Sequence, residues 1–268
     1  MSGLSRAPSA ANGGAGRVEN RSHLSRRNPQ WPAGTVASDG VAAGDRSHFR
    51  VMRGATLDPT LKPRLRGVLH QWAFAVSLAA GAGLVLEAGS ARARIAVTVY
   101  ALSVAALFGT SALYHRVNWR TLGARRWMRR LDHTMIFVLI AGTYTPFGLL
   151  VLRGTLGVVI LVAVWSAALA GAVFKLVWID APGWLGAATY VAIGWIALVA
   201  LPELLDRLGV AAFAALALGG VLYSVGAVIY AHKRPDPVPT VFGYHELFHL
   251  LVILAAALQY AVIAFWIL

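Results

Sequence analysis

The sequence predicts an all-α, polytopic membrane protein, a bundle of seven transmembrane helices. Of its 268 residues, 58% are hydrophobic and only 13% are charged, whereas roughly 25% are charged in an average soluble domain. Several uncharged stretches run for about 20 residues, the length that a helix needs to cross the hydrocarbon core of a bilayer. Each stretch is continuously apolar rather than alternating, which indicates helices and not the strands of a membrane barrel.

The first three predicted spans are separated by clusters of arginine. Residues 67–86 follow a basic N-terminal region, and Arg92 and Arg94 separate them from residues 95–114. A strongly basic loop then leads to the third span, residues 134–152. Its six arginines are Arg116, Arg120, Arg125, Arg126, Arg129 and Arg130.

The last four predicted spans are separated by loops with only one or two cations each. In chain order these spans are residues 155–174, 184–201, 208–231 and 247–268. The cations that precede them are Arg153, Lys175, Arg207, and the pair Lys233 and Arg234.

The distribution of these cations predicts the orientation of the bundle. Eleven of the 24 lysines and arginines precede the first span, and a cytoplasmic N-terminus places 20 of the 24 on the cytoplasmic side. Cytoplasmic loops carry the excess of Lys and Arg in membrane proteins. We therefore expect an N-in, C-out protein of the cell membrane.

Two domains are expected, a tail over residues 1–62 and a membrane domain over residues 63–268. The tail is rich in Ser, Gly, Ala, Pro and Arg without periodicity, which is typical of disorder. It lacks the apolar core of a secretory signal, so the first span is expected to direct insertion. The net charge of +13 favours attraction of this basic tail to anionic lipid headgroups over binding of nucleic acid.

Polar residues that suit a metal ion are predicted to meet near the cytoplasmic face. Ser111 and His115 lie four residues apart at the end of the second span, and His245 and His249 do so at the start of the seventh. Residues four apart share one face of a helix. Three imidazoles leave one tetrahedral position open for water, as in catalytic rather than structural zinc sites.

The third span starts with two adjacent candidates, Asp132 and His133. Neighbours on a helix point about 100° apart, so only one of them is expected to face the site. His70 and His232 lie at other helix ends and are expected to be interfacial residues, while His23 and His48 fall in the tail. The chain has no cysteine, which excludes disulfides and thiolate ligands.

The residues from His245 to His249 also match H-E-x-x-H, in which Glu246 would be the general base of a metalloprotease. An intramembrane protease is therefore an alternative. It is disfavoured because only the apolar C-terminal residues follow the motif, and no aspartate ligand occurs among them.

Three ordered segments resemble the hemolysin III family, within the wider group of progestin and adiponectin receptors and alkaline ceramidases. They are SALYHRV at 111–117, RRLDHTMIFVLIAGTYTPF at 129–147 and HELFHLLVILAAALQY at 245–260. The resemblance implies a seven-helix bundle whose zinc ligands are His115, His245 and His249. It places Asp132 beside the metal-bound water with Ser111 close by, and it gives neither His133 nor Glu246 the role of a ligand.

These features predict a zinc-dependent hydrolase of lipid amides or esters, of ceramidase type, with membrane lipid as its substrate. A receptor or regulator of membrane state with structural zinc is the second hypothesis. Cytolytic or pore activity is the third, although no predicted helix carries a polar stripe along its whole length. Oligomeric state stays open.

Overall fold

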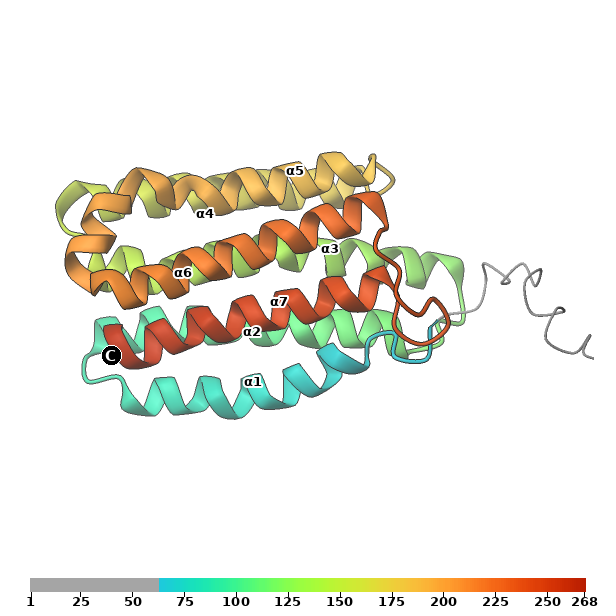
Figure 1. Cartoon of the computed structure of the whole chain (residues 1–268), viewed down its shortest axis with the longest axis horizontal. Helices are drawn as coiled ribbons and strands as arrows, with labels where there is room; N and C mark the ends of the chain where they lie inside the picture. The colour runs from blue at the N-terminus through green and yellow to red at the C-terminus, as the bar shows by residue number, and fades with distance from the viewer. Residues whose placement is uncertain (1–62) are drawn as a thin grey trace, which may run out of the picture. The chain divides into compact units, whose positions relative to one another are not determined.

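The computed structural model describes residues 63–268 and shows a bundle of helices whose axes follow one common direction (Figure 1). Regular structure in this part of the chain is helical, apart from one isolated bridge between Val238 and Phe242. The all-α prediction is therefore confirmed for these residues. The tail predicted over residues 1–62, with His23 and His48, lies outside the described residues.

Seven α-helices follow one another along the described chain, and short π- or 3₁₀-helical segments extend three of them. The α-helices are α1 (Val68–Glu87), α2 (Ala91–Arg116), α3 (Leu122–Pro146), α4 (Gly154–Val177), α5 (Gly183–Gly194), α6 (Leu201–His232) and α7 (Tyr244–Val262). The extensions are η3 (Phe147–Val151) after α3, η4 (Trp195–Ala200) after α5 and η5 (Ile263–Ile267) after α7.

Six helical stretches among the described residues are long and apolar enough to cross a membrane. The fifth of them, Gly183–His232, is 50 residues long and contains α5, η4 and α6. At Gly209 its backbone leaves the helical region, with φ 74°. Only glycine adopts such a φ without strain, so the helix is kinked at this residue. The chain is thus a multi-pass membrane protein.

Helix α3 begins well before the position that hydropathy predicts. Asp132 was expected to open this helix, but α3 starts at Leu122, after the cap Thr121, whose Oγ1 accepts a hydrogen bond from the N–H of Ala124 at 3.1 Å. Arginine is a good helix former, so the stretch assigned to a loop extends the helix. Helix α3 therefore includes four arginines, Arg125, Arg126, Arg129 and Arg130. Hydropathy did not predict this part of the helix, because it detects only apolar stretches.

The second half of α3 passes close to α2 and then changes its helical geometry. A Cβ atom at Gly142 would overlap the side chain of Ser103 on α2. Pro146 ends the α-helical hydrogen bonding, and the chain continues as the π-helical turn η3. Glycine at position 142 thus allows the close packing of α3 on α2, and Pro146 lies where the helical geometry changes.

Helix α7 starts at a turn that is held by two carboxylates. The N–H of Gly243 donates to Oε2 of Glu246 at 2.9 Å, and the N–H of Tyr244 donates to Oδ1 of Asp236 at 2.8 Å. Both bonds satisfy backbone donors that the first turn of a helix leaves unpaired. His245 is thereby placed in the first turn of α7, at the same end of the bundle as the last turn of α2.

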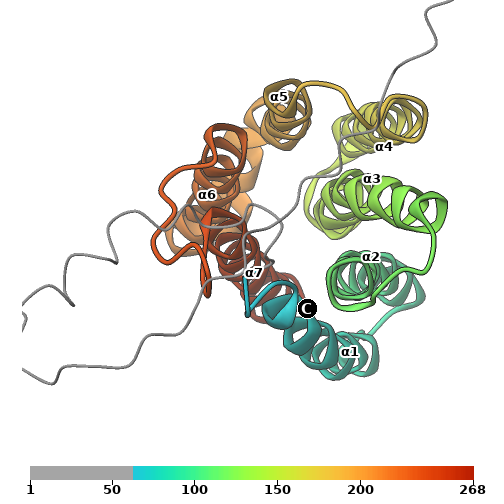
Figure 2. The same ribbon diagram turned by 90° about the vertical axis from the view of Figure 1, so that its right-hand side faces the viewer.

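Seen along its axis, the bundle places α7 between α6 and α1, with α2 to α5 completing the circuit (Figure 2). Helix α2 packs against α1 and α3, and α7 packs chiefly against α6. The interior between α3, α5, α6 and α7 holds a cavity, and the candidate site lies at one end of it.

Candidate metal centre

Three imidazoles from two helices meet at one end of the bundle. His115 lies in the last turn of α2, while His245 and His249 lie in the first two turns of α7. Their candidate ligand atoms all lie within 4.8 Å of one another, and Nε2 of His245 is 3.1 Å from Nε2 of His115. The i and i+4 spacing in α7 places two rings on one face, and α2 supplies the third.

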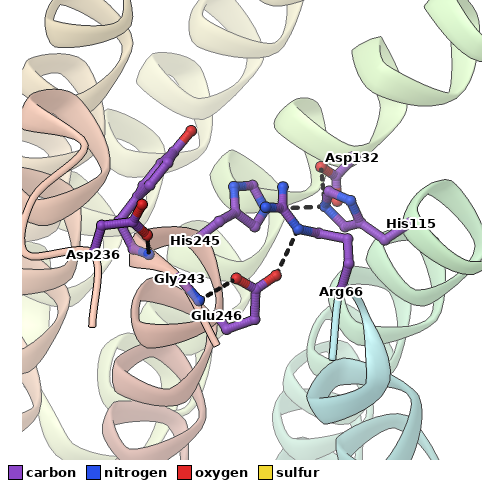
Figure 3. A network of polar contacts seen from close by, with 8 residues as sticks. Arg66, His115, Asp132, Asp236, Gly243, His245 and Glu246 are labelled. Carbon is purple, nitrogen blue, oxygen red and sulfur yellow. Dashed lines mark hydrogen bonds and ion pairs between the residues drawn. The ribbon is translucent and has the colours of Figure 1, made fainter. Parts of the chain in front are cut away.

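Asp132 and Ser111 lie beside these imidazoles. Oδ2 of Asp132, on α3, is 3.9 Å from Nε2 of His115 (Figure 3). Ser111, one turn before His115 on α2, is almost completely buried, and its side chain interacts with the Asp132 carboxyl. The carboxylate and the hydroxyl both line the cavity that the imidazoles border.

The three imidazoles fit a transition-metal ion. Two nitrogens bound to one tetrahedral zinc at about 2.1 Å lie roughly 3.4 Å apart, which is close to the separation of His115 and His245. A buried ring nitrogen, Nδ1 of His249, has no hydrogen-bond partner within residues 63–268. An imidazole that binds a metal needs no hydrogen bond at its ligating nitrogen. Small rotations of these side chains would therefore complete a site with three nitrogen ligands.

His133 lies outside the group of three. Its ring faces Tyr230, with centroids 6.2 Å apart, and its carbonyl oxygen accepts a hydrogen bond from the Tyr190 hydroxyl at 3.2 Å. Both His133 and Asp132 border the cavity, but it is the carboxyl of Asp132 that approaches His115.

The expectation that His70 is an interfacial residue is wrong. The side chain is only 3% exposed, and its ring stacks on His249 with centroids 3.7 Å apart and planes 12° apart. Both of its ring nitrogens are buried without a hydrogen-bond partner in the described part of the chain. Hydropathy gave no sign of this contact, but the predicted topology already put the start of the first span at the same membrane face as His115. His232 is exposed, as expected.

The start of α1 covers the imidazoles through three contacts. Nε of Arg66 pairs with Oε1 of Glu246 at 2.5 Å (Figure 3). Gly67 has φ 78°, and a Cβ atom there would lie 2.5 Å from Cβ of His115. His70 stacks on His249. Gly67 and His70 therefore contact the clustered histidines directly, and Arg66 contacts Glu246, the residue after His245.

Glu246 is not placed as a general base. Its side chain is fully buried, and its two oxygens face the guanidinium of Arg66 and the N–H of Gly243. A carboxylate held in this way caps α7 and pairs with a partly exposed cation. This geometry disfavours the protease alternative.

The cavity next to the cluster is large and mainly apolar. It encloses about 1130 Å³ not filled by protein atoms, counting its open mouth. Side chains from α2, α3, α5, α6 and α7 line it. Such a cavity suits a ligand with a long apolar part, whose polar end would lie near the imidazoles.

Fold and site together define a multi-pass helical membrane protein with a buried group of three histidines that could hold a metal ion. A family model described as Haemolysin-III related matches residues 60–260. The chain belongs to the hemolysin III family, as the three sequence segments predicted.

Known proteins from bacteria and animals are similar to this chain. A Hemolysin-3 homolog of Bacillus subtilis (strain 168) is 36% identical over 178 residues, which cover 66% of this chain and 80% of that protein. Hemolysin-3 of Bacillus cereus is 35% identical over 180 residues, or 67% of this chain and 78% of that one. The human Monocyte to macrophage differentiation factor is 25% identical over 170 residues, 62% of this chain and 68% of its own length.

Proposed function

We propose that this protein is a zinc-dependent hydrolase of lipid amides or esters in the cell membrane, with His115, His245 and His249 as the zinc ligands. One observation carries the proposal. The carboxylate of Asp132 lies 3.9 Å from an imidazole of the cluster, at the end of an apolar cavity. A base beside a metal-competent site and a cavity for an apolar chain are the two requirements of such a reaction.

A bound zinc ion would supply Lewis-acid chemistry, because it polarises a carbonyl group and makes water acidic near neutral pH. Asp132 is assigned as the base that takes a proton from the attacking water. Ser111 is assigned to donate its single hydroxyl hydrogen bond to the Asp132 carboxylate and so to hold it in place. The water oxygen forms a bond to the carbonyl carbon and the C–N or C–O bond breaks. The acyl part is released as a carboxylic acid, and the proton taken up by Asp132 passes to the departing amine or alcohol.

The orientation that fits this role is N-in and C-out, with seven spans. Residues 183–200, formed by α5 and η4, would be the fifth span, since about 17 residues are enough for a membrane helix. The 20 cations on the cytoplasmic side in this arrangement support it. Lipids of the inner leaflet would then reach the imidazoles from the cytoplasmic half of the bilayer.

The test uses purified protein in mixed micelles that contain lipid amides and esters, with mass spectrometry of the released acids. Zinc-loaded wild type is expected to release an acid, and Asp132→Asn to be roughly 100- to 10,000-fold slower while it keeps its zinc. If wild type holds zinc but cleaves no lipid, or if Asp132→Asn cleaves at the normal rate, the proposal fails.

A receptor or regulator with structural metal is the second candidate. The covering of the imidazoles by the start of α1 favours it, because Arg66, Gly67 and His70 close one side of the cluster. The same experiment separates the two candidates, since this one predicts bound metal without turnover. The mainly apolar lining of the cavity gives no support to the cytolytic pore alternative.

A further inference from the structure

The apolar cavity extends well beyond the imidazoles. A second hollow of about 810 Å³ continues from it toward the opposite end of the bundle. The two hollows share the residues Thr143, Tyr144, Gly194, Trp195, Gly220 and Gln259. A ligand at the cluster can therefore extend its apolar part past this junction.

Most polar groups at the junction have partners within the protein. The hydroxyl of Tyr144 donates to the carbonyl of Gly194 at 2.6 Å and accepts from the N–H of Ala197 at 2.7 Å. These bonds satisfy backbone groups where α5 gives way to η4. Likewise Nε1 of Trp195 donates to Oγ of Ser224 at 3.0 Å. The backbone break at mid-bundle is thus hydrogen-bonded inside the protein, as membrane depth requires.

Two polar atoms at the same level have no such partner. The hydroxyl oxygen of Tyr223 on α6 and Oε1 of Gln259 on α7 are both buried, and neither has a hydrogen bond within residues 63–268. Both residues border the cavity. Leaving such an atom unsatisfied destabilises the folded protein, and more so in a hydrocarbon environment.

The two side chains border the same cavity from neighbouring helices, α6 and α7. A Cβ atom at Gly219 would be 3.6 Å from Cγ of Gln259, so Gln259 packs against the turn of α6 that contains Gly219. Tyr223 lies four residues later on the same face, and side chains on a helix lean toward its N-terminus. The phenol of Tyr223 therefore leans toward the turn on which Gln259 packs.

A hydroxyl group is the ligand chemistry that satisfies both atoms. It donates to the amide oxygen of Gln259 and accepts from the phenol of Tyr223. Gln259 lies ten residues after His249 on α7, which is about 15 Å along the helix axis at 1.5 Å per residue. The matching hydroxyl would lie at about that distance from the polar end of a ligand held at the imidazoles.

We propose that Tyr223 and Gln259 form a second binding site inside the cavity, which recognises a hydroxyl group partway along an acyl chain. This inference deepens the proposed function and rests on it for the placement of the polar end. The ligand class is an acyl lipid hydroxylated about 15 Å from its head, at the distance that separates His249 and Gln259 along α7.

The experiment measures binding, without any turnover. Saturated fatty acids of one length, either unsubstituted or with one hydroxyl at a series of positions, compete with a fluorescent fatty acid for the purified full chain in detergent. Wild type is expected to bind one positional isomer roughly tenfold more tightly than the unsubstituted acid. In Tyr223→Phe and in Gln259→Leu this preference should fall to about threefold or less, and in the double variant it should vanish.

Tyr260→Phe is the matched control. Tyr260 is the neighbour of Gln259 on α7, but its hydroxyl donates to the carbonyl of Ala80 on α1 and does not border the cavity. This variant should keep the full preference. Unchanged affinity for the unsubstituted acid would show that the Tyr223 and Gln259 variants are folded.

Three results would overturn the inference: no binding of any fatty acid, equal affinity of wild type for all the acids, or a preference that survives in the double variant. Equal affinity would mean that water satisfies the two atoms. The proposed hydrolase is judged separately, because lipid cleavage without this preference leaves the hydrolase intact. A preference without cleavage would leave the second binding site intact.

Discussion

The rings of His70 and His249 stack face to face, with centroids 3.7 Å apart. This contact joins the start of α1 to the second turn of α7, across a separation of 179 residues in the sequence. Phe108 of α2 also packs against His70, with ring centroids 5.0 Å apart. His70 thus acts as a positioning residue, because it restricts the ring of a candidate metal ligand to one orientation.

Replacing His70 should weaken metal binding according to how much stacking is lost. His70→Ala removes the ring and should lower the affinity for zinc by roughly 10- to 100-fold, as loss of a residue that orients a ligand does. His70→Phe keeps a ring against His249 and should bind zinc nearly as wild type does. Competition with a chromogenic chelator measures both affinities. Equal losses in the two variants would show that the nitrogens of His70, and not its ring face, matter.

The metal content of the purified protein should depend on the three clustered imidazoles and not on His133. His115→Ala and His249→Ala each remove one of the three candidate ligands and should abolish stoichiometric metal after purification. His133→Ala should retain the metal, because that ring faces Tyr230 instead. Elemental analysis of the purified proteins checks this. Loss of metal in the His133 variant together with retention in either of the others would refute the assignment.

Loss of the ion pair between Arg66 and Glu246 should lower the free energy of unfolding most when only its cation is removed. The side chain of Glu246 is 0% exposed and that of Arg66 is 20% exposed. Arg66→Ala leaves a buried carboxylate without its cation and should cost about 3–5 kcal/mol in the free energy of unfolding. Glu246→Gln should cost less, because an amide oxygen can still cap Gly243 and Arg66 can reach water.

Unfolding in detergent measures these effects, and the double variant provides the control. Arg66→Ala combined with Glu246→Gln should be more stable than Arg66→Ala alone, because no buried charge is left unpaired. Additive losses in the double variant would contradict the coupling between these two side chains.

Acid should weaken a contact between α3 and the turn after α4. Asp180 accepts hydrogen bonds from Arg126 at 2.5 Å and Arg129 at 3.0 Å. The hydrogen bond from Arg126, with the charges of Arg126 and Arg129, lowers the pKa of the Asp180 carboxyl below its usual value. Its contribution is therefore fully present above about pH 4, the ordinary pKa of an aspartate, and is lost as the pH falls through the lowered value.

The thermal stability of wild type and Asp180→Asn in detergent, followed from neutral pH into the acid range, tests this. Because the carboxylate is exposed, the difference at neutral pH should be small and should shrink further in high salt. The difference in thermal stability between the two proteins should disappear as acid protonates Asp180. A gap that widens on acidification would contradict this sign.

The sequence alone determined the class of the protein and most of its candidate site. Long uncharged stretches can hardly be anything but membrane helices, and i, i+4 spacing places two imidazoles on one face whatever surrounds them. These local rules predicted the helices and the pairs Ser111 with His115 and His245 with His249. They missed the early start of α3, because the arginines that extend it are helix formers that no hydropathy measure detects.

Only the tertiary structure decided which side chains meet across helices. Nothing local in the sequence distinguishes His70, which stacks on His249, from His232, which is exposed. Nor does it show that Glu246 pairs with Arg66 instead of serving as a base, or that Tyr223 and Gln259 face one cavity. Such contacts depend on how each helix is rotated about its axis. Packing against all of its neighbours sets that rotation, so no single segment encodes it.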